Sequence, residues 1–273
     1  MEIIVADHSG FCPGARYVVE IAESNGRAYS LGPILHNEQL IERLRKKGVI
    51  PLTLDEILEK RSGKVIIRAH GVPAEEITAL KEAGFDVKDG TCSKVKDVYD
   101  ISQEHESQGY KIFVFGDRDH PEVIGIVSRL QDPVVIGKVE DIPDEHYEKV
   151  CLVSQTTQIP SAYEEIRKAL ERKYDELKAI ANTICPATQE RQDAASALAK
   201  DVDVMLVIGG KKSSNTNNLY KLCRRVNPQT YHVQTKDDLD KEQFKDVGSV
   251  GITAGASTPN FIIISVFKEL MKY

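Results

Sequence analysis

The hydrophobic and polar positions of this chain alternate between short apolar runs and longer segments with apolar residues at helical spacing. The stretch Tyr110–Arg129 shows this most clearly, because its residues 111–115 are mostly apolar and β-prone and predict a buried strand. A polar loop follows, and Pro121 then begins a helix in the one turn that tolerates proline. His120 and Glu122 are therefore expected at a helix N-terminus just past a strand, where open α/β sheets bind ligands, anions especially.

The same strand–loop–helix arrangement occurs three times, which we interpret as an internal threefold repeat. Each copy opens with a cysteine and a helical segment, and predicted strands follow over residues 27–34, 110–116 and 203–210. Each strand leads into a polar loop and another helix. The second half of each copy adds a short strand, an acidic turn, a further strand and a closing helix. Strands that alternate with helices are typical of parallel βαβ units.

We therefore predict an α/β fold of three small lobes related by pseudo-threefold symmetry, a trefoil in which each lobe has a mostly parallel sheet with flanking helices. The expected lobes are residues 1–91, 92–184 and 185–273. A chain of 273 residues can form three such lobes. Because no linker rich in Pro, Gly or Ser separates them, the lobes should pack closely around a shared centre that holds the active site.

Composition excludes several classes of protein. The net charge of −6 argues against nucleic acid as a partner, so an anionic ligand must be held by a local site. No apolar run approaches the length of a membrane span, and the first residues lack a basic segment before an apolar one. We expect a cytoplasmic monomer that does not insert into membranes.

Three of the five cysteines occupy matching places in the repeat, each just before a predicted helix: Cys12, Cys92 and Cys185. A helix N-terminus lowers the pKa of a thiol and favours the thiolate, which is the form that binds metal. Three thiolates suit zinc or an iron–sulfur cluster and leave one coordination position open, as in catalytic sites. The alternative is that they are three buried thiols. Cys151 and Cys223 lie outside these places and are predicted to be core residues.

A second set of polar residues lies in loops that follow the predicted strands. Imidazoles, hydroxyls and an amide near helix N-termini suit an oxyanion, most plausibly a phosphate or diphosphate. The set comprises His36, His70, His120, Thr156, Ser213, Ser214, Asn215 and Ser257. Glu38 and Glu122 follow two of the histidines at matching places, and either is a candidate proton donor or a helix N-terminal charge.

Taken together, the motifs of this chain resemble those of the 4-hydroxy-3-methylbut-2-enyl diphosphate reductases, which act last in the methylerythritol phosphate route to isoprenoids. The resemblance covers essentially the whole chain. Three positions depart from the usual family residues, namely Gly90, Ser93 and Lys212, and none is a predicted ligand. The motifs that carry the resemblance are GFCPGA, RAHGVP, DGTCSKV, HPEVIG, SQTT, ICPATQERQ, KSSNT and TAGASTP.

The resemblance implies a trefoil around an oxygen-sensitive [4Fe–4S] cluster held by Cys12, Cys92 and Cys185. It implies that Glu122 is the proton source and that Thr156 contacts the hydroxyl end of the substrate. The reaction would be reductive dehydroxylation to isopentenyl or dimethylallyl diphosphate, with flavodoxin or ferredoxin as electron donor. The resemblance further implies that the diphosphate is bound by His36, His70, His120, Ser213, Ser214, Asn215 and Ser257.

Two other functions use the same residues. A zinc-dependent phosphoester hydrolase would employ the three cysteines and Glu122. An iron–sulfur electron carrier or redox sensor would employ the cysteines without needing the histidine, serine and asparagine pocket. Iron and sulfide in the purified protein would exclude the hydrolase, whereas turnover of a diphosphate would exclude the carrier.

Overall fold

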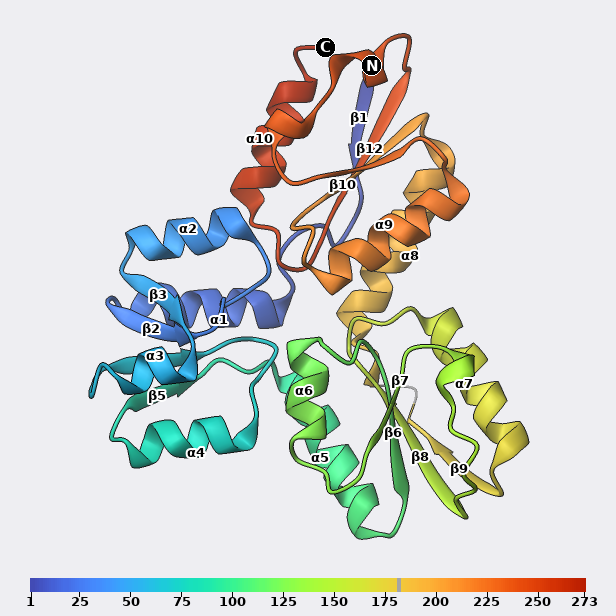
Figure 1. Ribbon diagram of the computed structural model, residues 1–273. Coiled ribbons are helices and arrows are strands. Elements are labelled where there is room, and N and C mark those ends of the chain that lie inside the picture. Colours follow the sequence, from blue (N-terminus) through green and yellow to red (C-terminus); the bar gives the residue numbers. More distant parts are fainter. Residues whose placement is uncertain (181–182) are drawn as a thin grey trace. The chain divides into compact units, whose positions relative to one another are not determined.

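The computed structural model describes residues 1–180 and 183–273 (Figure 1). Within these residues, twelve strands form three four-stranded sheets, and every strand pair in them is parallel. The predicted fold class, α/β lobes with parallel sheets and flanking helices, is confirmed. The strands are β1 (Glu2–Val5), β2 (Ala28–Leu31), β3 (Val49–Leu52), β4 (Lys64–Ile67), β5 (Asp86–Asp89), β6 (Lys111–Phe115), β7 (Val134–Ile136), β8 (Lys149–Ser154), β9 (Glu176–Ala179), β10 (Val204–Ile208), β11 (Thr230–Val233) and β12 (Ser249–Ala254).

Helices connect successive strands, as parallel pairing requires. Several begin at proline, including the helices after Cys12 and Cys185, so the predicted proline-led starts of these helices are confirmed. The helices are α1 (Pro13–Ser24), α2 (Glu38–Lys46), α3 (Leu54–Leu58), α4 (Ala74–Glu82), α5 (Ser93–Ser107), α6 (Pro121–Val127), α7 (Pro160–Lys173), α8 (Pro186–Asp201), α9 (Ser214–Val226) and α10 (Asn260–Leu270), with 3₁₀ turns at Val139–Asp141, Lys236–Asp238 and Lys241–Phe244.

The three sheets share one strand order. The orders are β3-β2-β4-β5, β7-β6-β8-β9 and β11-β10-β12-β1, so each sheet has two central strands and two edge strands in matching places. This supports the internal repeat. It also corrects the first predicted lobe, residues 1–91, because β1 does not join the sheet of β2–β5. Glu2 instead lies opposite Ser249 and Val5 opposite Ile252, so β1 completes the C-terminal sheet.

The chain divides into two compact units. Unit 1 comprises Met1–Arg16, Leu35–Arg43 and Pro186–Tyr273 and contains the sheet of β1, β12, β10 and β11. Unit 2 comprises Tyr17–Ile34 and Leu44–Cys185 and contains the other two sheets. The arrangement of the three lobes around one centre stays a prediction.

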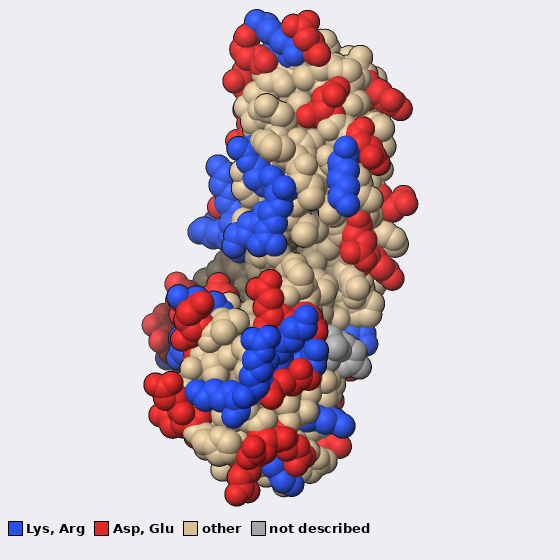
Figure 2. Space-filling model, turned by 90° about the vertical axis from the view of Figure 1, so that its right-hand side faces the viewer, with Lys and Arg blue, Asp and Glu red and all other residues tan. Residues whose placement is uncertain are grey.

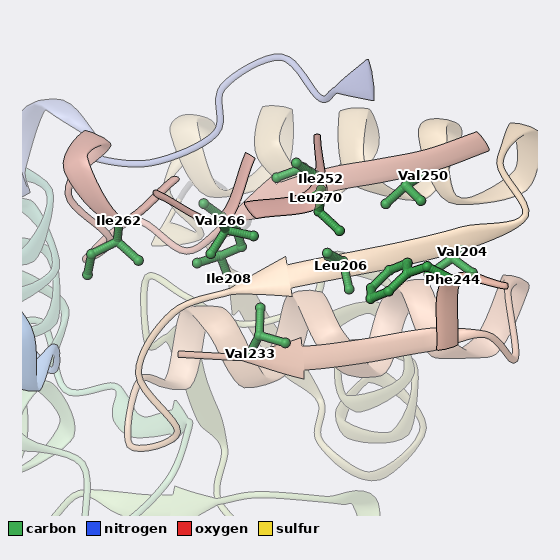
Figure 3. Close-up of a cluster of buried hydrophobic side chains, with 11 residues drawn as sticks. Val204, Leu206, Ile208, Val233, Phe244, Val250, Ile252, Ile262, Val266 and Leu270 are labelled. Carbon is green, nitrogen blue, oxygen red and sulfur yellow. The ribbon is translucent and has the colours of Figure 1, made fainter. Parts of the chain in front are cut away.

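The sheet of unit 1 is covered on both faces, which explains its nearly continuous apolar strands. On one face, Leu206 and Ile252 belong to a buried cluster with α10, to which Val266 and Leu270 contribute (Figure 3). On the other face, residues of β10 pack against small side chains of α8 and α9; this cluster includes Ala195, Ala199, Met205, Val207, Leu219 and Cys223. Alternate residues of β10 thus serve opposite faces of the sheet.

Both signs of charge occur on the surface. On the face shown in Figure 2, clusters of Lys and Arg lie between groups of Asp and Glu. Because the surface carries both signs of charge, an anionic ligand must be held by local contacts rather than by a uniformly basic surface.

Among the described residues, no helix is both long and apolar enough to cross a bilayer.

Replacement of Ile252 by alanine should destabilise unit 1. Ile252 is fully buried in the central strand β12, so Ile252→Ala is expected to lower the free energy of unfolding by about 3 kcal/mol. The matched control is Ile264→Ala, because that side chain is 51% exposed on α10 and its loss should change stability by less than about 0.5 kcal/mol. Urea unfolding followed by circular dichroism measures both. Equal losses in the two variants would contradict the assigned packing.

Candidate active site

The predicted site residues follow the carboxyl ends of the parallel strands. His36 and His120 lie beyond β2 and β6, and Ser213 lies beyond β10. In open parallel sheets these ends bind ligands, since the connecting loops gather there. Unit 1 contains Cys12, His36, Ser213, Ser214, Asn215 and Ser257, and unit 2 contains His70, Cys92, His120, Glu122, Thr156 and Cys185.

Each of the three repeat cysteines makes the same kind of backbone hydrogen bond. In each case the cysteine N–H donates to the carbonyl oxygen of the residue two positions after a central strand, which fixes the cysteine against the end of its sheet. The bonds are Cys12 to Ala256 at 3.4 Å, Cys92 to Ala69 at 3.0 Å and Cys185 to Thr156 at 3.0 Å. This regularity, repeated in three separate sheets, supports a common role for the three thiols.

Each of these cysteines also directly precedes a helix, α1, α5 or α8, and each is half-buried. The Cys12 Sγ accepts a hydrogen bond from the Ala15 N–H at 3.4 Å. In unit 2, the pKa of the Lys94 ammonium is raised, mainly by Asp97 and to a smaller extent by Cys185 and Cys92. Both thiols of unit 2 thus lie within electrostatic range of one lysine.

The two remaining cysteines have a different environment. Cys151 in β8 and Cys223 in α9 are fully buried within hydrophobic clusters. Burial raises the pKa of each thiol to about 12, so both remain neutral at physiological pH. Their predicted role as core residues is confirmed.

Glu122 and Thr156 form a buried pair in unit 2. The Thr156 N–H donates to Glu122 Oε1 at 2.6 Å, and the Thr156 hydroxyl donates to Oε2 at 2.9 Å. Glu122 is 1% exposed, and desolvation raises the pKa of its carboxyl group to about 7, although both bonds from Thr156 oppose the rise. A carboxyl group that is partly protonated near neutral pH is suited to donate a proton.

The extent of burial distinguishes Glu38 from Glu122, the two carboxylates that the sequence offers as candidate proton donors. Glu38 is the first residue of α2 and is exposed, whereas Glu122 is the second residue of α6 and is buried. An exposed carboxylate near a helix N-terminus is explained by the helix dipole alone. Glu122 is therefore the stronger candidate for acid chemistry.

His120 caps α6 and contacts a second predicted site residue. Its Nδ1 accepts a hydrogen bond from the Glu122 N–H at 3.2 Å, which places the proton of the neutral imidazole on Nε2. The ring centroids of His120 and His70 are 5.3 Å apart in an edge-to-face arrangement. His70, His120, Glu122 and Thr156 therefore form one group of candidate site residues within unit 2.

In unit 1, Ser213, Asn215 and Ser257 form a second group of buried polar side chains. The Ser257 hydroxyl donates to Ser213 Oγ at 3.3 Å, and Ser213 caps α9. Asn215 Oδ1 accepts from the Ala256 N–H at 3.0 Å, while Asn215 Nδ2 is buried without a hydrogen-bond partner among the described residues. A buried amide donor without a partner costs free energy unless a ligand satisfies it, so this group is suited to an anion.

His36 joins this second group through its backbone. The Ser257 hydroxyl lies 3.5 Å from the His36 carbonyl oxygen. A Cβ at Gly210 would lie 2.3 Å from the same oxygen, so only glycine lets the loop after β10 approach His36 this closely. Ser214, the first residue of α9, is half-buried beside Ser213.

The structure places Thr156 one residue earlier in the repeat than His70 and Ser257. Thr156 lies two residues after β8, as Ala69 and Ala256 lie two residues after β4 and β12. The sheet position that corresponds to His70 and Ser257 is therefore occupied by Thr157. Thr156 differs from its two alanine counterparts in carrying the hydroxyl that binds Glu122.

Sequence reasoning missed Arg191, a buried cation of α8. It is 2% exposed, and its Nη2 donates to the Gly10 carbonyl oxygen at 2.7 Å, which holds the segment between β1 and Cys12. A signal for it exists in the sequence, because Arg191 lies at helical spacing on the buried stripe of α8 that also contains Thr188, Ala195 and Ala199.

Comparisons with known proteins agree along the whole chain. A family model described as LytB protein matches residues 3–271. The 4-hydroxy-3-methylbut-2-enyl diphosphate reductase of Caldanaerobacter subterraneus subsp. tengcongensis is 42% identical over 99% of this chain and 96% of its own length. The enzyme of the same name from Aquifex aeolicus is 42% identical over 100% of this chain and 96% of its own.

Solved structures are similar as well. One, described as (E)-4-hydroxy-3-methyl-but-2-enyl diphosphate reductase, the terminal enzyme of the non-mevalonate pathway, superposes with a TM-score of 0.74 at 40% identity, and both chains are fully covered. The E-1-hydroxy-2-methyl-but-2-enyl-4-diphosphate reductase of Plasmodium falciparum superposes with a TM-score of 0.93 at 26% identity, over 100% of this chain and 88% of that one.

The pKa of Glu122 predicts a pH-dependent loss of stability. Because folding raises the pKa from 4.5 to about 7, the folded state binds more protons than the unfolded state between these values, and stability falls as the pH rises through this window. Glu122→Gln removes this penalty, so relative to the wild type it should gain up to about 3 kcal/mol between pH 4.5 and pH 8.

Urea unfolding at several pH values measures this difference. The control is Glu165→Gln, an exposed carboxylate of α7 in the same unit, which should keep the wild-type pH dependence. A Glu122→Gln variant whose stability follows the wild-type curve across the window would show that Glu122 ionises normally.

Proposed function

The chain belongs to the LytB family, and on this basis we propose that the protein is a 4-hydroxy-3-methylbut-2-enyl diphosphate reductase. The reaction is the two-electron reductive dehydroxylation of (E)-4-hydroxy-3-methylbut-2-enyl diphosphate to isopentenyl diphosphate and dimethylallyl diphosphate. The observation in this chain that carries the proposal is the buried Glu122–Thr156 pair, because loss of the allylic hydroxyl requires a proton at neutral pH.

Hydroxide is a poor leaving group, so cleavage of the carbon–oxygen bond needs a proton on the departing oxygen. Protonated Glu122 can donate to Thr156 Oγ1, and the Thr156 hydroxyl can in turn donate to the substrate hydroxyl. Their separation of 2.9 Å is a hydrogen-bonding distance and permits this relay without movement of the backbone. The Thr156 N–H keeps its bond to the other carboxyl oxygen and fixes the orientation of the group.

The residues proposed to bind the diphosphate are hydrogen-bond donors near the ends of the strands. In unit 1 these are the hydroxyls of Ser213, Ser214 and Ser257 and the buried Nδ2 of Asn215, with His36 beside them. In unit 2 they are His70 and the Nε2–H of His120. Neutral and charge-assisted donors of this kind are typical of phosphate sites. Binding of the diphosphate positions the distal hydroxyl for proton transfer.

The residues present fit the [4Fe–4S] cluster that the family resemblance implies. Cys12, Cys92 and Cys185 are half-buried, precede helices and share one hydrogen-bonding pattern, whereas the other two cysteines are fully buried and neutral. Three thiolates would hold such a cluster and leave one iron without a protein ligand. When bound, the cluster supplies single-electron transfers and Lewis acidity.

The remaining features of the proposal rest on the family resemblance. A small acidic redox protein, flavodoxin or ferredoxin, delivers the electrons, and the enzyme acts as a cytoplasmic monomer. A zinc-dependent hydrolase and a simple electron carrier have less support, because the matched relatives are named as reductases and neither alternative requires Glu122 to be buried beside Thr156.

The three repeat cysteines should be required for the cluster. Cys92→Ser is expected to reduce iron and sulfide content by at least about half after anaerobic purification, since one of three thiolates is lost. The control is Cys223→Ser, a buried thiol beside the Ala195 carbonyl oxygen that a serine hydroxyl could also contact, and it should keep full iron content. Full iron content and turnover in Cys92→Ser would contradict the assignment.

Glu122 should be required for turnover and not for binding. Glu122→Gln is expected to lower kcat by about 10²-fold or more while KM changes little, because a general acid acts mainly in the transition state. Glu38→Gln is the control, since Glu38 occupies the matching helix start but is exposed, and its kcat should stay near that of the wild type. An anaerobic assay with the hydroxylated diphosphate and a chemical reductant measures both. The opposite order of losses would transfer the proton role to Glu38.

A further inference from the structure

Three consecutive backbone carbonyl groups next to His70 are each held by a side chain. The Tyr99 hydroxyl donates to the His70 carbonyl oxygen at 3.4 Å. Arg68 Nε donates to the Gly71 carbonyl oxygen at 3.1 Å, and Arg129 Nη1 donates to the Val72 carbonyl oxygen at 3.0 Å. Side-chain donors therefore hold the carbonyl oxygen of every residue from 70 to 72.

Two of these side chains come from the helices that flank the neighbouring sheet of unit 2. Tyr99 belongs to α5, and Arg129 lies just beyond the end of α6. The Arg129 guanidinium stacks on the Tyr99 ring at 3.9 Å and also donates to the Gly125 carbonyl oxygen within α6. The pair thus connects the loop after β4 with the helix that carries His120 and Glu122.

Two glycines make room for the Tyr99 hydroxyl. A Cβ at Gly71 would lie 2.0 Å from this oxygen, and a Cβ at Gly125 would lie 2.5 Å from it. Gly71 also has φ of +74°, which favours glycine. Tyr99 itself is 6% exposed, and burial raises the pKa of its hydroxyl, so the group stays a neutral donor at physiological pH.

We propose that Tyr99, backed by Arg129, is a positioning residue that holds His70 against α6 and so sets the spacing of the His70 and His120 side chains for the anionic end of the substrate. The two imidazole centroids are 5.3 Å apart, and they lie on elements that the Tyr99 hydroxyl and the Arg129 guanidinium connect. The proposal rests on the proposed function, in which both histidines bind the diphosphate.

Tyr99→Phe tests the proposal because it removes the hydroxyl and keeps the ring under Arg129. The matched control is Tyr163→Phe: Tyr163 is also buried, in α7, and its hydroxyl also donates to a backbone carbonyl oxygen, that of Leu152 at 3.5 Å. In the anaerobic reductase assay, Tyr99→Phe should raise KM by about fivefold to tenfold, the equivalent of one hydrogen bond, with kcat changed by less than about twofold. Tyr163→Phe should change neither.

Hydrogen exchange provides a readout that does not depend on turnover. Amides of residues 69–72 should exchange faster in Tyr99→Phe than in the wild type and in Tyr163→Phe, while other regions of unit 2 stay unchanged. If the wild-type protein had no reductase activity, the proposed function would fail, and the exchange data would still test the contact. Unchanged exchange at residues 69–72 in Tyr99→Phe, or equal KM changes in the two variants, would overturn the positioning role.

A double variant adds an independent check. Gly125→Ala should raise KM because its methyl group would displace the Tyr99 hydroxyl, and Tyr99→Phe in the same chain should recover part of the loss since the oxygen is gone. Two losses that simply multiply would show that Gly125 and Tyr99 do not act through this contact. If Gly125→Ala does not fold, the exchange and KM data for Tyr99→Phe decide the matter alone.

Discussion

The same hydrogen bond fixes one cysteine at the end of each sheet: the cysteine N–H donates to a carbonyl oxygen just beyond a central parallel strand. The bond arises because each cysteine follows an edge strand and precedes a helix, so its backbone turns across the end of the neighbouring strand. The same carbonyl ends of the strands carry the hydroxyls, imidazoles and the acid. Parallel sheets therefore bring candidate site residues to the same kind of edge from loops that are far apart in sequence.

Burial of Glu122 lowers the stability of the fold at neutral pH and keeps the carboxyl group partly protonated there. Desolvation raises the pKa of Glu122, and two bonds from Thr156 limit the rise, so the group stays near the point of half-protonation instead of becoming permanently neutral. Thr156 also accepts the Cys185 N–H through its carbonyl oxygen. Thr156 thus connects the acid, through its hydroxyl and N–H, with a predicted cluster ligand, through its carbonyl oxygen. The alanines at this position in the other two sheets have no hydroxyl.

Much of the fold could be predicted because the central strands and the helices have strong apolar patterns. The edge strands that lead to the cysteines could not: Asp86–Asp89 and Glu176–Ala179 are short, charged and partly exposed, so they lack a two-residue alternation long enough to detect. The pairing of Glu2–Val5 with Ser249–Ala254 was also beyond prediction, since no local pattern specifies a partner at the other end of the chain.

The candidate residues could be found from the repeat, yet the choice between Glu38 and Glu122 needed burial, which depends on tertiary packing. Tyr99 and Arg129 were missed for a related reason. In sequence they look like an ordinary core aromatic and a surface cation, and only the carbonyl groups of a distant loop reveal what they hold. Supporting contacts of this kind leave little trace in a single sequence.

The interleaving of the two chain ends has a consequence for biogenesis. Strand β1 and the Cys12 backbone pair with Ser249–Ala254 and Ala256, which are synthesised long after them. The sheets of β2–β5 and β6–β9 need no residue beyond Ala179 and can form while the ribosome is still translating. Cys12 thus acquires its scaffold later in synthesis than Cys92 and Cys185, whose hydrogen-bond partners precede them in the chain.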